Sequence, residues 1–278
     1  MKITNKMLEA YGRDLTAGEK SSNTVGKYLR DVAAFREWNG GKAITKDTVI
    51  AYKQYLEDKG YKARSINSML ASLNSFFTFL GRDELKVKSL RVQRDIYRDE
   101  NKELTRAEYR RLCAAAEKKH NERLVLILQT ICGTGIRVSE LRFITAEAVQ
   151  RGEAVVHLKG KTRTVLLVRE LQKKLLKYTR ERGIRSGPVF VTKSGNPMSR
   201  SNIWREMKAL CADASVDPSK VFPHNLRHLF ARVFYGLDKD IAKLADILGH
   251  SSIETTRIYI MTGVEEHRRY MENMRLVT

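Results

Sequence analysis

Features that would place this chain in a membrane, outside the cell or around a structural metal are missing from its sequence. No apolar run approaches the roughly 18 residues that a membrane-spanning helix needs. The N-terminus, MKITNKMLEAYG, lacks the apolar core of a signal peptide. The three cysteines form no Cys-x-x-Cys pair and fit reduced, buried thiols: Cys113, Cys132 and Cys211. We therefore expect a cytoplasmic protein.

Acidic residues are also in short supply. The chain carries 52 Lys and Arg against 32 Asp and Glu, which gives a net charge of +20 and a pI near 9.9. Such an excess indicates a polyanionic partner. The basic residues are spread along the chain, which favours a folded protein that wraps DNA over a flexible basic arm. Charge alone also fits an RNA-binding protein, but the sequence lacks the stacking-aromatic motifs of known RNA-binding modules.

The length and composition of the chain predict two domains. Its 278 residues, of which 42% are hydrophobic, are enough for two sizeable cores. Apolar positions at helical spacing predict a bundle of three or four amphipathic helices within residues 1–88. Residues 89–100 combine dense charge with weak periodicity and are predicted to be an interdomain linker. Residues 101–278 are predicted to form the second domain.

Signals for helix ends occur in both domains. In the first domain we expect helices to begin at three places: Ser22 or Asn23, Thr45, and Ser65. In the second, Thr105 and Glu108 predict a capping box. A buried helix through Leu124–Leu128 is predicted to stop at Gly133–Gly135, so that Arg137 opens the next helix. The free amides of a helix start and a guanidinium group favour phosphate binding there.

The second domain also contains a β-hairpin pattern. Residues 154–158 and 164–168 are predicted to be its two strands, and residues 159–163 are predicted to form a tight, Lys-rich turn between them. A further short strand is predicted at Val189–Val191. The fold class predicted for the whole chain is therefore mainly α with a small β-sheet (α+β).

The densest grouping of reactive side chains lies in residues 223–260. His224 and Arg227 form a His-x-x-Arg pair, His250 ends a Leu-Gly-His corner, and Tyr259 follows nine residues later. Each of these residues alone is more typical of a structural role. Together, an Arg and two His near one Tyr suit a tyrosine hydroxyl that attacks a phosphodiester, because cations and imidazoles neutralise the oxygens and handle the protons.

This ordered series resembles the second catalytic box of the tyrosine recombinases, also called the phage integrase family. Gly133-Thr-Gly-Ile-Arg137-Val-Ser-Glu140-Leu141 resembles the first box of the same family. The resemblance covers the catalytic two-thirds of the chain closely and residues 1–90 more loosely. It implies a helical, SAM-like core-binding domain and a catalytic domain that together form a C-shaped clamp on DNA. It also implies a C-terminal tail, after Tyr259, that docks onto a neighbouring protomer.

The resemblance implies a transesterification mechanism. Tyr259 is expected to attack the scissile phosphate, which leaves a 3′-phosphotyrosine and a free 5′-hydroxyl. Arg137 and Arg227 are expected to bind the non-bridging oxygens, and His250 is expected to donate a hydrogen bond to the phosphate. Because the covalent link conserves the energy of the broken bond, no ATP is needed.

Proton transfer is expected to involve a histidine and a lysine. The resemblance implies that His224 manages the proton of the nucleophile. It also implies that a lysine on the β-hairpin protonates the leaving 5′-oxygen; counting back from the second strand selects Lys159, and Lys161 is the alternative. Glu140 is expected to steady the site without a direct chemical role.

A metal site at His224 and His228 is not expected. These histidines are four residues apart, which places both on one helical face. The metalloprotease pattern requires Glu after the first His, but Asn225 stands there, and no third ligand is suitably spaced. The cationic side chains would supply the charge that a metal supplies elsewhere, so neither a metal nor another cofactor is expected.

Six further residues are candidate DNA contacts. Three are expected on the helical module: Lys62, Arg64 and Asn67. In the second domain, a helix is predicted to begin at Ser199 or Ser201, and the family uses a helix here to approach the major groove. Basic residues near that helix start are the other candidates: Lys193, Arg200 and Arg205.

The expected partner is double-stranded DNA with specific recombination sites. The resemblance implies a homotetramer on DNA and a Holliday-junction intermediate, with a monomer when free, and accessory DNA-bending proteins are compatible with it. The early start of the helical module favours an Xer-like recombinase, resolvase or invertase, and a mobile-element integrase stays open. Two alternatives share some features: a type IB topoisomerase has the same chemistry, and a non-catalytic DNA-binding protein explains the charge but not the assembled motif.

Overall fold

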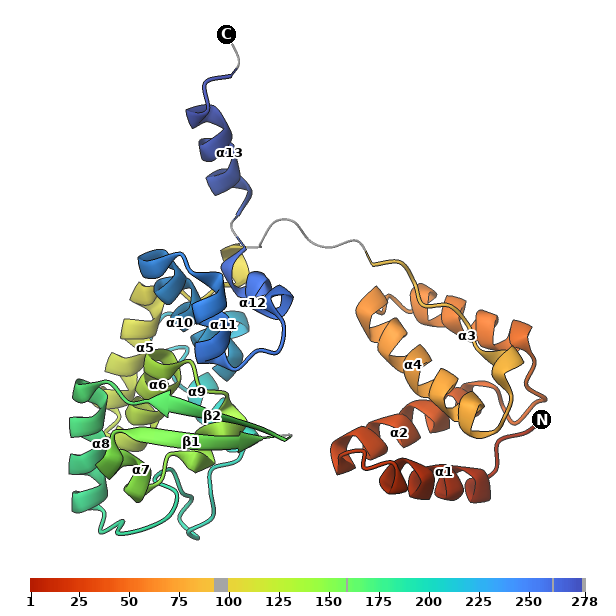
Figure 1. Ribbon diagram of the computed structural model, residues 1–278, viewed down its shortest axis with the longest axis horizontal. Coiled ribbons are helices and arrows are strands. Elements are labelled where there is room, and N and C mark those ends of the chain that lie inside the picture. The colour runs from red at the N-terminus through yellow and green to blue at the C-terminus, as the bar shows by residue number, and fades with distance from the viewer. Residues whose placement is uncertain (93–99, 159, 262, 277–278) are drawn as a thin grey trace. The chain divides into compact units, whose positions relative to one another are not determined.

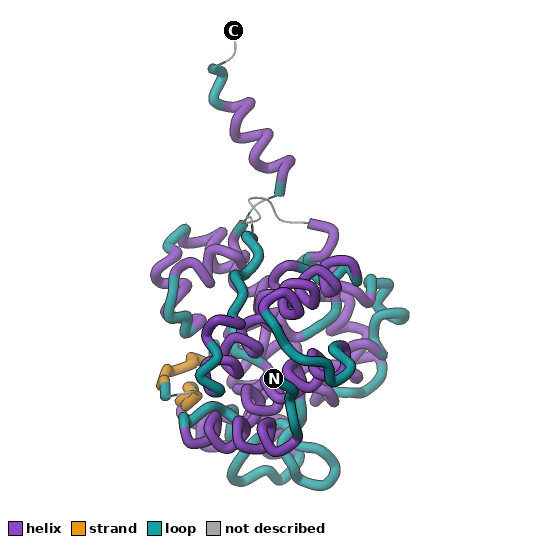
Figure 2. The backbone as a smooth tube through the Cα atoms, turned by 90° about the vertical axis from the view of Figure 1, so that its right-hand side faces the viewer, coloured by secondary structure: helices purple, strands orange, loops and turns teal. Residues whose placement is uncertain are grey.

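The chain divides into two compact units, Met1–Arg94 and Asp95–Thr278 (Figure 1). The structure, a computed structural model, describes residues 1–92, 100–158, 160–261 and 263–276. The boundary between the units falls in the predicted linker 89–100, of which residues 93–99 lie outside the described residues. The predicted fold class is confirmed, since helices dominate both units and one two-stranded sheet occurs in the described part (Figure 2).

Four helices and a short 3-10 helix build the first unit. They are α1 (Asn5–Ala17), α2 (Ser22–Trp38), α3 (Lys46–Asp58), α4 (Ala63–Phe79) and η1 (Asp83–Leu85). Aromatic side chains from all four α-helices meet in its core; the ring of Phe35, for example, lies 5.0 Å from that of Tyr52. Edge-to-face aromatic contacts of this kind add to the stabilisation that apolar burial provides. The predicted helical bundle is therefore present.

The helix starts in this unit were predicted with mixed success. Thr45 and Thr48 form a capping box at the start of α3, as the position of Thr45 predicted. The predicted cap of α2 was wrong: the Ser21 side chain, one residue earlier, accepts a hydrogen bond from the Thr24 amide. Helix α4 begins at Ala63 rather than Ser65. Adjacent serines are equivalent caps by residue type, so the sequence does not distinguish them.

Two asparagines on α4 hold the chain that leads out of the unit. The Asn67 amide exchanges two hydrogen bonds with the backbone of Leu90, at 2.9 and 2.7 Å. Asn74 makes the same pair of bonds with Val87, at 2.9 and 3.1 Å. The two asparagines are seven residues apart and therefore lie on one helix face. The extended segment 86–90 is thus fixed along α4 on the side that leads to the linker.

The second unit contains nine α-helices among its described residues, with 3-10 helices and a hairpin between them. The elements in order are η2 (Glu100–Lys102), α5 (Arg106–Lys118), α6 (Glu122–Thr134), η3 (Val138–Phe143), α7 (Ala146–Arg151), β1 (Glu153–Leu158), β2 (Lys161–Leu166), α8 (Arg169–Glu181), α9 (Arg200–Lys208), η4 (Pro218–Lys220), α10 (Pro223–Asp238), α11 (Ile241–Leu248), α12 (Ile253–Ile260) and α13 (Val264–Asn273).

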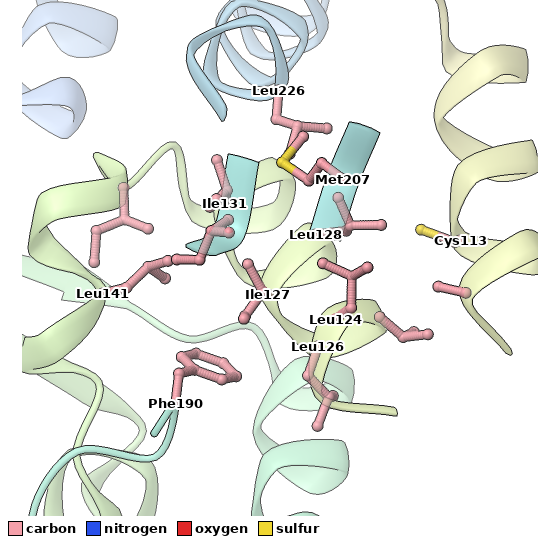
Figure 3. Close-up of a cluster of buried hydrophobic side chains, with 14 of the residues drawn as sticks. Cys113, Leu124, Leu126, Ile127, Leu128, Ile131, Leu141, Phe190, Met207 and Leu226 are labelled. Atoms are coloured by element: carbon pink, nitrogen blue, oxygen red, sulfur yellow. The ribbon is translucent and has the colours of Figure 1, made fainter. Parts of the chain in front are cut away.

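Helix α6 forms the centre of the second unit. It packs against α5, α8, α9 and α10, and Figure 3 shows its apolar side chains below Met207 of α9 and Leu226 of α10 and above Phe190. A helix that is apolar on most of its circumference belongs inside a domain. The predicted start and end of this region are confirmed: Thr105 and Glu108 form the capping box of α5, and Gly135 ends α6 in the left-handed conformation.

The β-hairpin has a shorter turn than the sequence predicted. The register pairs Leu158 with Lys161, so the tip contains two residues, and the described one, Gly160, has a φ of 72° that suits such a turn. The predicted turn over residues 159–163 was wrong, because the second strand begins at Lys161. The strand begins with three polar residues, Lys161, Thr162 and Arg163, which are typical of a turn and explain the wrong prediction.

The predicted strand at Val189–Val191 was also wrong. Val189 and Phe190 are buried in the core, but the segment makes two isolated bridges, Thr145 with Pro188 and Val191 with Pro197. Proline has no amide hydrogen for a ladder, which explains why pairing does not extend. The following helix, α9, is capped by Ser199, one of the two predicted caps.

Within the described residues, no helix combines the length and the apolar character that a membrane crossing requires.

Substitution of Gly135 tests the packing at the end of α6. Gly135 and Gly183 share a φ of 64°, but a Cβ at Gly135 would lie 2.5 Å from the Phe230 ring, whereas Gly183 faces open space. We expect Gly135→Ala to lower the free energy of unfolding of the second unit by about 3 kcal/mol. Gly183→Ala is the control and should cost about 1 kcal/mol. Equal losses in urea titrations would contradict this account.

Candidate active site

The structure brings together five of the six predicted catalytic residues. Arg137 precedes η3, His224 and Arg227 lie in the first two turns of α10, His250 follows α11, and Tyr259 lies on α12. Helix α10 begins with Pro223 at its first position, where a missing amide hydrogen costs nothing. The sixth residue, Lys159, lies outside the described residues.

Arg227 lies at the bottom of the site and is 1% exposed. Its Nη1 donates to the carbonyl of Gly135, and its Nη2 donates to the carbonyl of Leu248 at 2.7 Å. These carbonyls lie at the C-terminal ends of α6 and α11, where backbone acceptors lack helical partners and the helix dipoles favour a cation. Burial, followed by the charge of Arg137, lowers the pKa of Arg227 to about 10, so the group is charged at neutral pH.

Arg137 and Arg163 share one buried carboxylate, that of Glu140. The Glu140 oxygens accept from the Arg137 backbone amide and Nη1, both at 2.9 Å, and from Arg163 Nη2 at 2.7 Å. Burial alone would raise the pKa of Glu140, but the Arg137 amide and the Arg163 charge outweigh it and lower that pKa. The carboxylate is therefore ionised and balances part of the local positive charge.

The segment after Arg137 differs from the prediction. It is a six-residue 3-10 helix, η3, rather than an α-helix. The Glu140 carboxylate already occupies the Arg137 amide, so this amide is not available to an anion. The Arg137 guanidinium remains 36% exposed, and its Nη2 lies 3.3 Å from the Gly249 carbonyl. Anion binding at this position therefore depends on the side chain more than on the helix start.

The hydrogen bonds of His250 define its tautomer. Arg227 Nη2 lies 2.9 Å from His250 Nε2, and a guanidinium can only donate, so Nε2 accepts. Nδ1 then carries the hydrogen and donates to the Thr256 hydroxyl at 2.8 Å. Burial, followed by the charges of Arg227 and Arg137, lowers the pKa of His250 to about 4. In the free protein this imidazole is neutral at physiological pH.

Tyr259 lies among three imidazole rings. Its ring centroid is 4.2 Å from that of His228, 5.1 Å from that of His250 and 5.4 Å from that of His224. It is 6% exposed and belongs to a small apolar cluster of α10, α11 and α12. Helix α12 is capped by Ser252, whose side chain accepts from the Glu254 amide.

His224 lies at the solvent-exposed edge of this group. Desolvation of the packed part of its ring is the largest cause that lowers its pKa to about 4, and the neighbouring His228 and Arg227 lower it further. The imidazole is therefore neutral near pH 7 and has a free lone pair to accept a proton. Arg200 also contributes to this shift, so this candidate DNA contact at the start of α9 lies close to His224.

The sequence did not reveal several residues that support the site. Arg163 and Thr256, described above, are two of them. Glu103 is the third. Its Oε2 lies 2.8 Å from Arg232 Nη1, and its Oε1 lies 3.7 Å from Nδ1 of His228. The His228 ring in turn packs against Tyr259. Glu103 and His228 are far apart in sequence and follow no spacing rule. In the sequence, His228 was considered only as a possible metal ligand together with His224.

Metal binding at that pair has no geometric support in the part of the chain that the structure describes. The rings of His224 and His228 lie 4.6 Å apart in an edge-to-face arrangement. No group of three His, Cys, Asp or Glu side chains among the described residues is arranged to hold a metal ion. That the reaction needs no metal stays a prediction.

The other predicted residues are placed as follows. The Lys161 backbone starts β2, and its side chain lies outside the described part of the structure. Lys193 and Arg205 line the same cavity of about 210 Å³ beside α9. Lys62 and Arg64 are exposed at the start of α4. The Asn67 amide is bonded to Leu90, so its expected contact with DNA stays a prediction.

The fold and this grouping of guanidinium, imidazole and phenol groups define the class of tyrosine-dependent DNA strand transferases. A family model described as the phage integrase family matches residues 102–266, and one for the N-terminal SAM-like domain of phage integrases matches residues 8–84. The chain belongs to the phage integrase family, which confirms the resemblance found in its sequence.

Named relatives and a solved structure agree with this assignment. The chain is 30% identical to tyrosine recombinase XerA of Pyrococcus furiosus over 99% of this chain and 96% of that protein. It is 31% identical to tyrosine recombinase XerD of Pseudomonas aeruginosa over 86% of each. The structure of XerH site-specific recombinase in a post-cleavage complex with a palindromic difH substrate has a TM-score of 0.75 at 18% identity, and the match covers 96% of this chain and 84% of that chain.

The protonation of His250 provides a test of the charge in this site. We expect NMR of the free protein to give a His250 titration midpoint near pH 4, against about 6.5 in urea-unfolded chain. The folded state binds this proton less well than the unfolded state, so its stability is full above pH 6.5 and falls as the pH drops towards 4. A midpoint near 6.5 in the folded protein would contradict the described hydrogen bonds.

Proposed function

We propose that this chain is a site-specific DNA recombinase that cuts and rejoins strands through a 3′-phosphotyrosine at Tyr259. The observation that carries the proposal is the position of the nearly buried Tyr259 among three imidazoles, close to the charged Arg227. A phenol confined in this way approaches a phosphate from one direction only. Tyrosine recombinases that match almost the whole chain support the same chemistry.

Phosphate binding is assigned to Arg137 and Arg227. The exposed guanidinium of Arg137 is available to an incoming phosphate, and Arg227 supplies positive charge from beneath the site. Negative charge on the pentacoordinate phosphorus then develops next to fixed cations, which need no reorganisation during the reaction. Because the side chains provide this charge, we propose that the reaction needs neither a metal nor another cofactor.

Proton transfer follows from the two low imidazole pKa values. Neutral His224 accepts the Tyr259 proton as the phenol oxygen bonds to phosphorus. The hairpin lysine, Lys159 or alternatively Lys161, gives a proton to the departing 5′-oxygen. His250 has no hydrogen on Nε2 in the free protein. A bound phosphate offsets the surrounding cations and raises the pKa of His250, so that the imidazolium then donates a hydrogen bond to the phosphate.

The substrate is double-stranded DNA that carries specific recombination sites. We assign contacts with the duplex to exposed basic residues of both units, together with Asn67: Lys62, Arg64, Asn67, Lys193, Arg200 and Arg205. Both units would contact the duplex. The net charge of +20 supports strong, salt-sensitive binding to phosphates. The protein would act in the cytoplasm, on nucleoid DNA.

Strand exchange requires several protomers. We propose a homotetramer on DNA that passes through a Holliday junction and forms from free monomers, with accessory DNA-bending proteins as optional partners. Helix α13 would dock onto a neighbouring protomer. Large apolar side chains that are exposed on and after this helix support the docking role: Val264, Tyr270, Met271, Met274 and Leu276. This much exposed apolar surface on one short segment favours a protein partner.

The relatives XerA and XerD favour an Xer-like recombinase, with resolution or inversion of DNA as its proposed outcome and integration of a mobile element as the second possibility. A type IB topoisomerase and a non-catalytic DNA-binding protein, the two alternatives from sequence, find no support in these relatives.

Covalent trapping tests the proposal. Nicked duplexes that carry candidate sites from the genetic neighbourhood of this chain would be incubated with the wild type, with Tyr259→Phe and with Tyr235→Phe. Tyr235, on α10, has no assigned role in catalysis and controls for loss of a hydroxyl. We expect an adduct on denaturing gels with the wild type and Tyr235→Phe, and none with Tyr259→Phe, while DNA binding stays within about twofold. Tight binding without an adduct, or an adduct that maps elsewhere, contradicts the proposal.

A further inference from the structure

We propose that Arg163 is a positioning residue that fixes the β1–β2 hairpin, and with it the general-acid lysine at the hairpin tip, against the phosphate-binding side chains. The proposal rests on the proposed function, because it takes a hairpin lysine as the general acid. Arg163 lies outside both catalytic boxes, residues 133–141 and 223–260. The contacts of its side chain point to a role in the site.

Arg163 connects the hairpin to two separate parts of the site. Its Nη2 donates to Glu140 Oε2 at 2.7 Å, and its Nη1 donates to the Ile247 carbonyl at 2.6 Å. The side chain is 13% exposed, and Glu140 is 1% exposed. Both bonds are partly buried, and one joins full charges, so they are stronger than bonds at the surface. The planar guanidinium reaches both acceptors at once, which an ammonium group does not.

The stem of Arg163 packs against the Leu-Gly-His corner. A Cβ added to Gly249 would lie 2.4 Å from Arg163 Cδ and 2.8 Å from its Nε. Gly249 also has a φ of 64°, where other residues are strained. Glycine at this corner is therefore required both by the backbone and by the space that Arg163 takes. The next residue is His250, so the same side chain borders the Arg137–Glu140 pair and the His250 segment.

The position of Arg163 on β2 determines what it holds in place. Arg163 pairs with Val156 of β1, and the register closes with Leu158 opposite Lys161 around a two-residue tip. Arg163 is three positions after Gly160 at the tip, which is roughly 10 Å of extended strand. Arg163 is thus a polar anchor close to the tip. An anchored hairpin limits the positions that a lysine at its tip can reach.

This placement affects one part of the chemical step. As the bond from Tyr259 oxygen to phosphorus forms, the bond from phosphorus to the 5′-oxygen breaks, and the lysine ammonium gives that oxygen a proton. Proton transfer requires the lysine nitrogen and the 5′-oxygen to be within hydrogen-bond distance of each other. A hairpin without its anchor would misplace the ammonium and slow the departure of the 5′-oxygen. Binding of the phosphate by Arg137 and Arg227 would change less.

A substrate with a sulfur leaving group isolates this effect. Replacing the bridging 5′-oxygen by sulfur gives a leaving group whose conjugate acid has a pKa near 8.5, so that departure does not need a proton. Cleavage of the oxygen and sulfur substrates would be compared for the wild type, Arg163→Met, Lys159→Ala and Lys161→Ala. We expect Arg163→Met to slow cleavage of the oxygen substrate about 100-fold and to cleave the sulfur substrate within about threefold of the wild type.

Three further variants serve as controls. Arg169→Met removes one exposed positive charge beyond the hairpin and should leave both rates near those of the wild type. Arg137→Gln removes a phosphate-binding charge and should slow both substrates to a similar extent. Arg163→Lys keeps the positive charge but lacks the planar fork that reaches both acceptors, and it is expected to fall between Arg163→Met and the wild type on the oxygen substrate. If Arg163→Met does not fold, Arg163→Lys is compared with the wild type on both substrates in its place.

The outcomes separate the inference from the proposed function. If Lys159→Ala or Lys161→Ala recovers on the sulfur substrate and the Arg163 variants do not, the general acid stands and the positioning role of Arg163 is overturned. Normal cleavage of the oxygen substrate by the Arg163 variants overturns it as well. If neither lysine variant recovers, the assignment of the general acid fails, and the role of Arg163 fails with it. Recovery of both a lysine variant and the Arg163 variants is the expected result.

Discussion

The burial of one charged side chain, Arg227, sets the arrangement of this active site. A guanidinium that is 1% exposed is stable only where acceptors replace the water that it has lost. The protein provides the carbonyls at the ends of α6 and α11 and the Nε2 of His250. These acceptors belong to segments far apart in sequence, so satisfying Arg227 also fixes the two helix ends and the His250 ring relative to α10.

Beyond the effect of burial, the positive charges of the site lower the pKa values of the neighbouring His224, His250 and Glu140. Burial and the guanidinium groups keep His224 and His250 neutral, with pKa values near 4, while Glu140 stays ionised between Arg137 and Arg163. The free site therefore holds an unprotonated base and an excess of cations before a substrate arrives. A DNA phosphate supplies the missing negative charge. Preorganised charge of this kind accounts for large parts of enzymatic rate enhancement.

The sequence predicted the local features of this structure better than the contacts between distant segments. The Thr105 capping box, the buried α6 and its end at Gly135 depend on neighbouring residues, so patterns of a few residues revealed them. The start of the second hairpin strand was predicted wrongly because Lys161 and the polar residues after it are typical of a turn. The sequence also did not predict the contacts of Arg163 with Glu140 and of Glu103 with His228. These contacts join residues far apart in the chain, and the residue types alone suggest ordinary surface charges.

The central claim is that Arg227 assembles the site before DNA binds, and unfolding of the free protein in urea tests it most directly. Arg227→Gln should lower the free energy of unfolding of the second unit by roughly 3 kcal/mol, because three buried acceptors lose a charged donor. Arg137→Gln removes a half-exposed guanidinium and should cost roughly 1 kcal/mol, since Arg163 still pairs with Glu140. If the two variants are equally stable, Arg227 does not organise the free site, and DNA binding must assemble it instead.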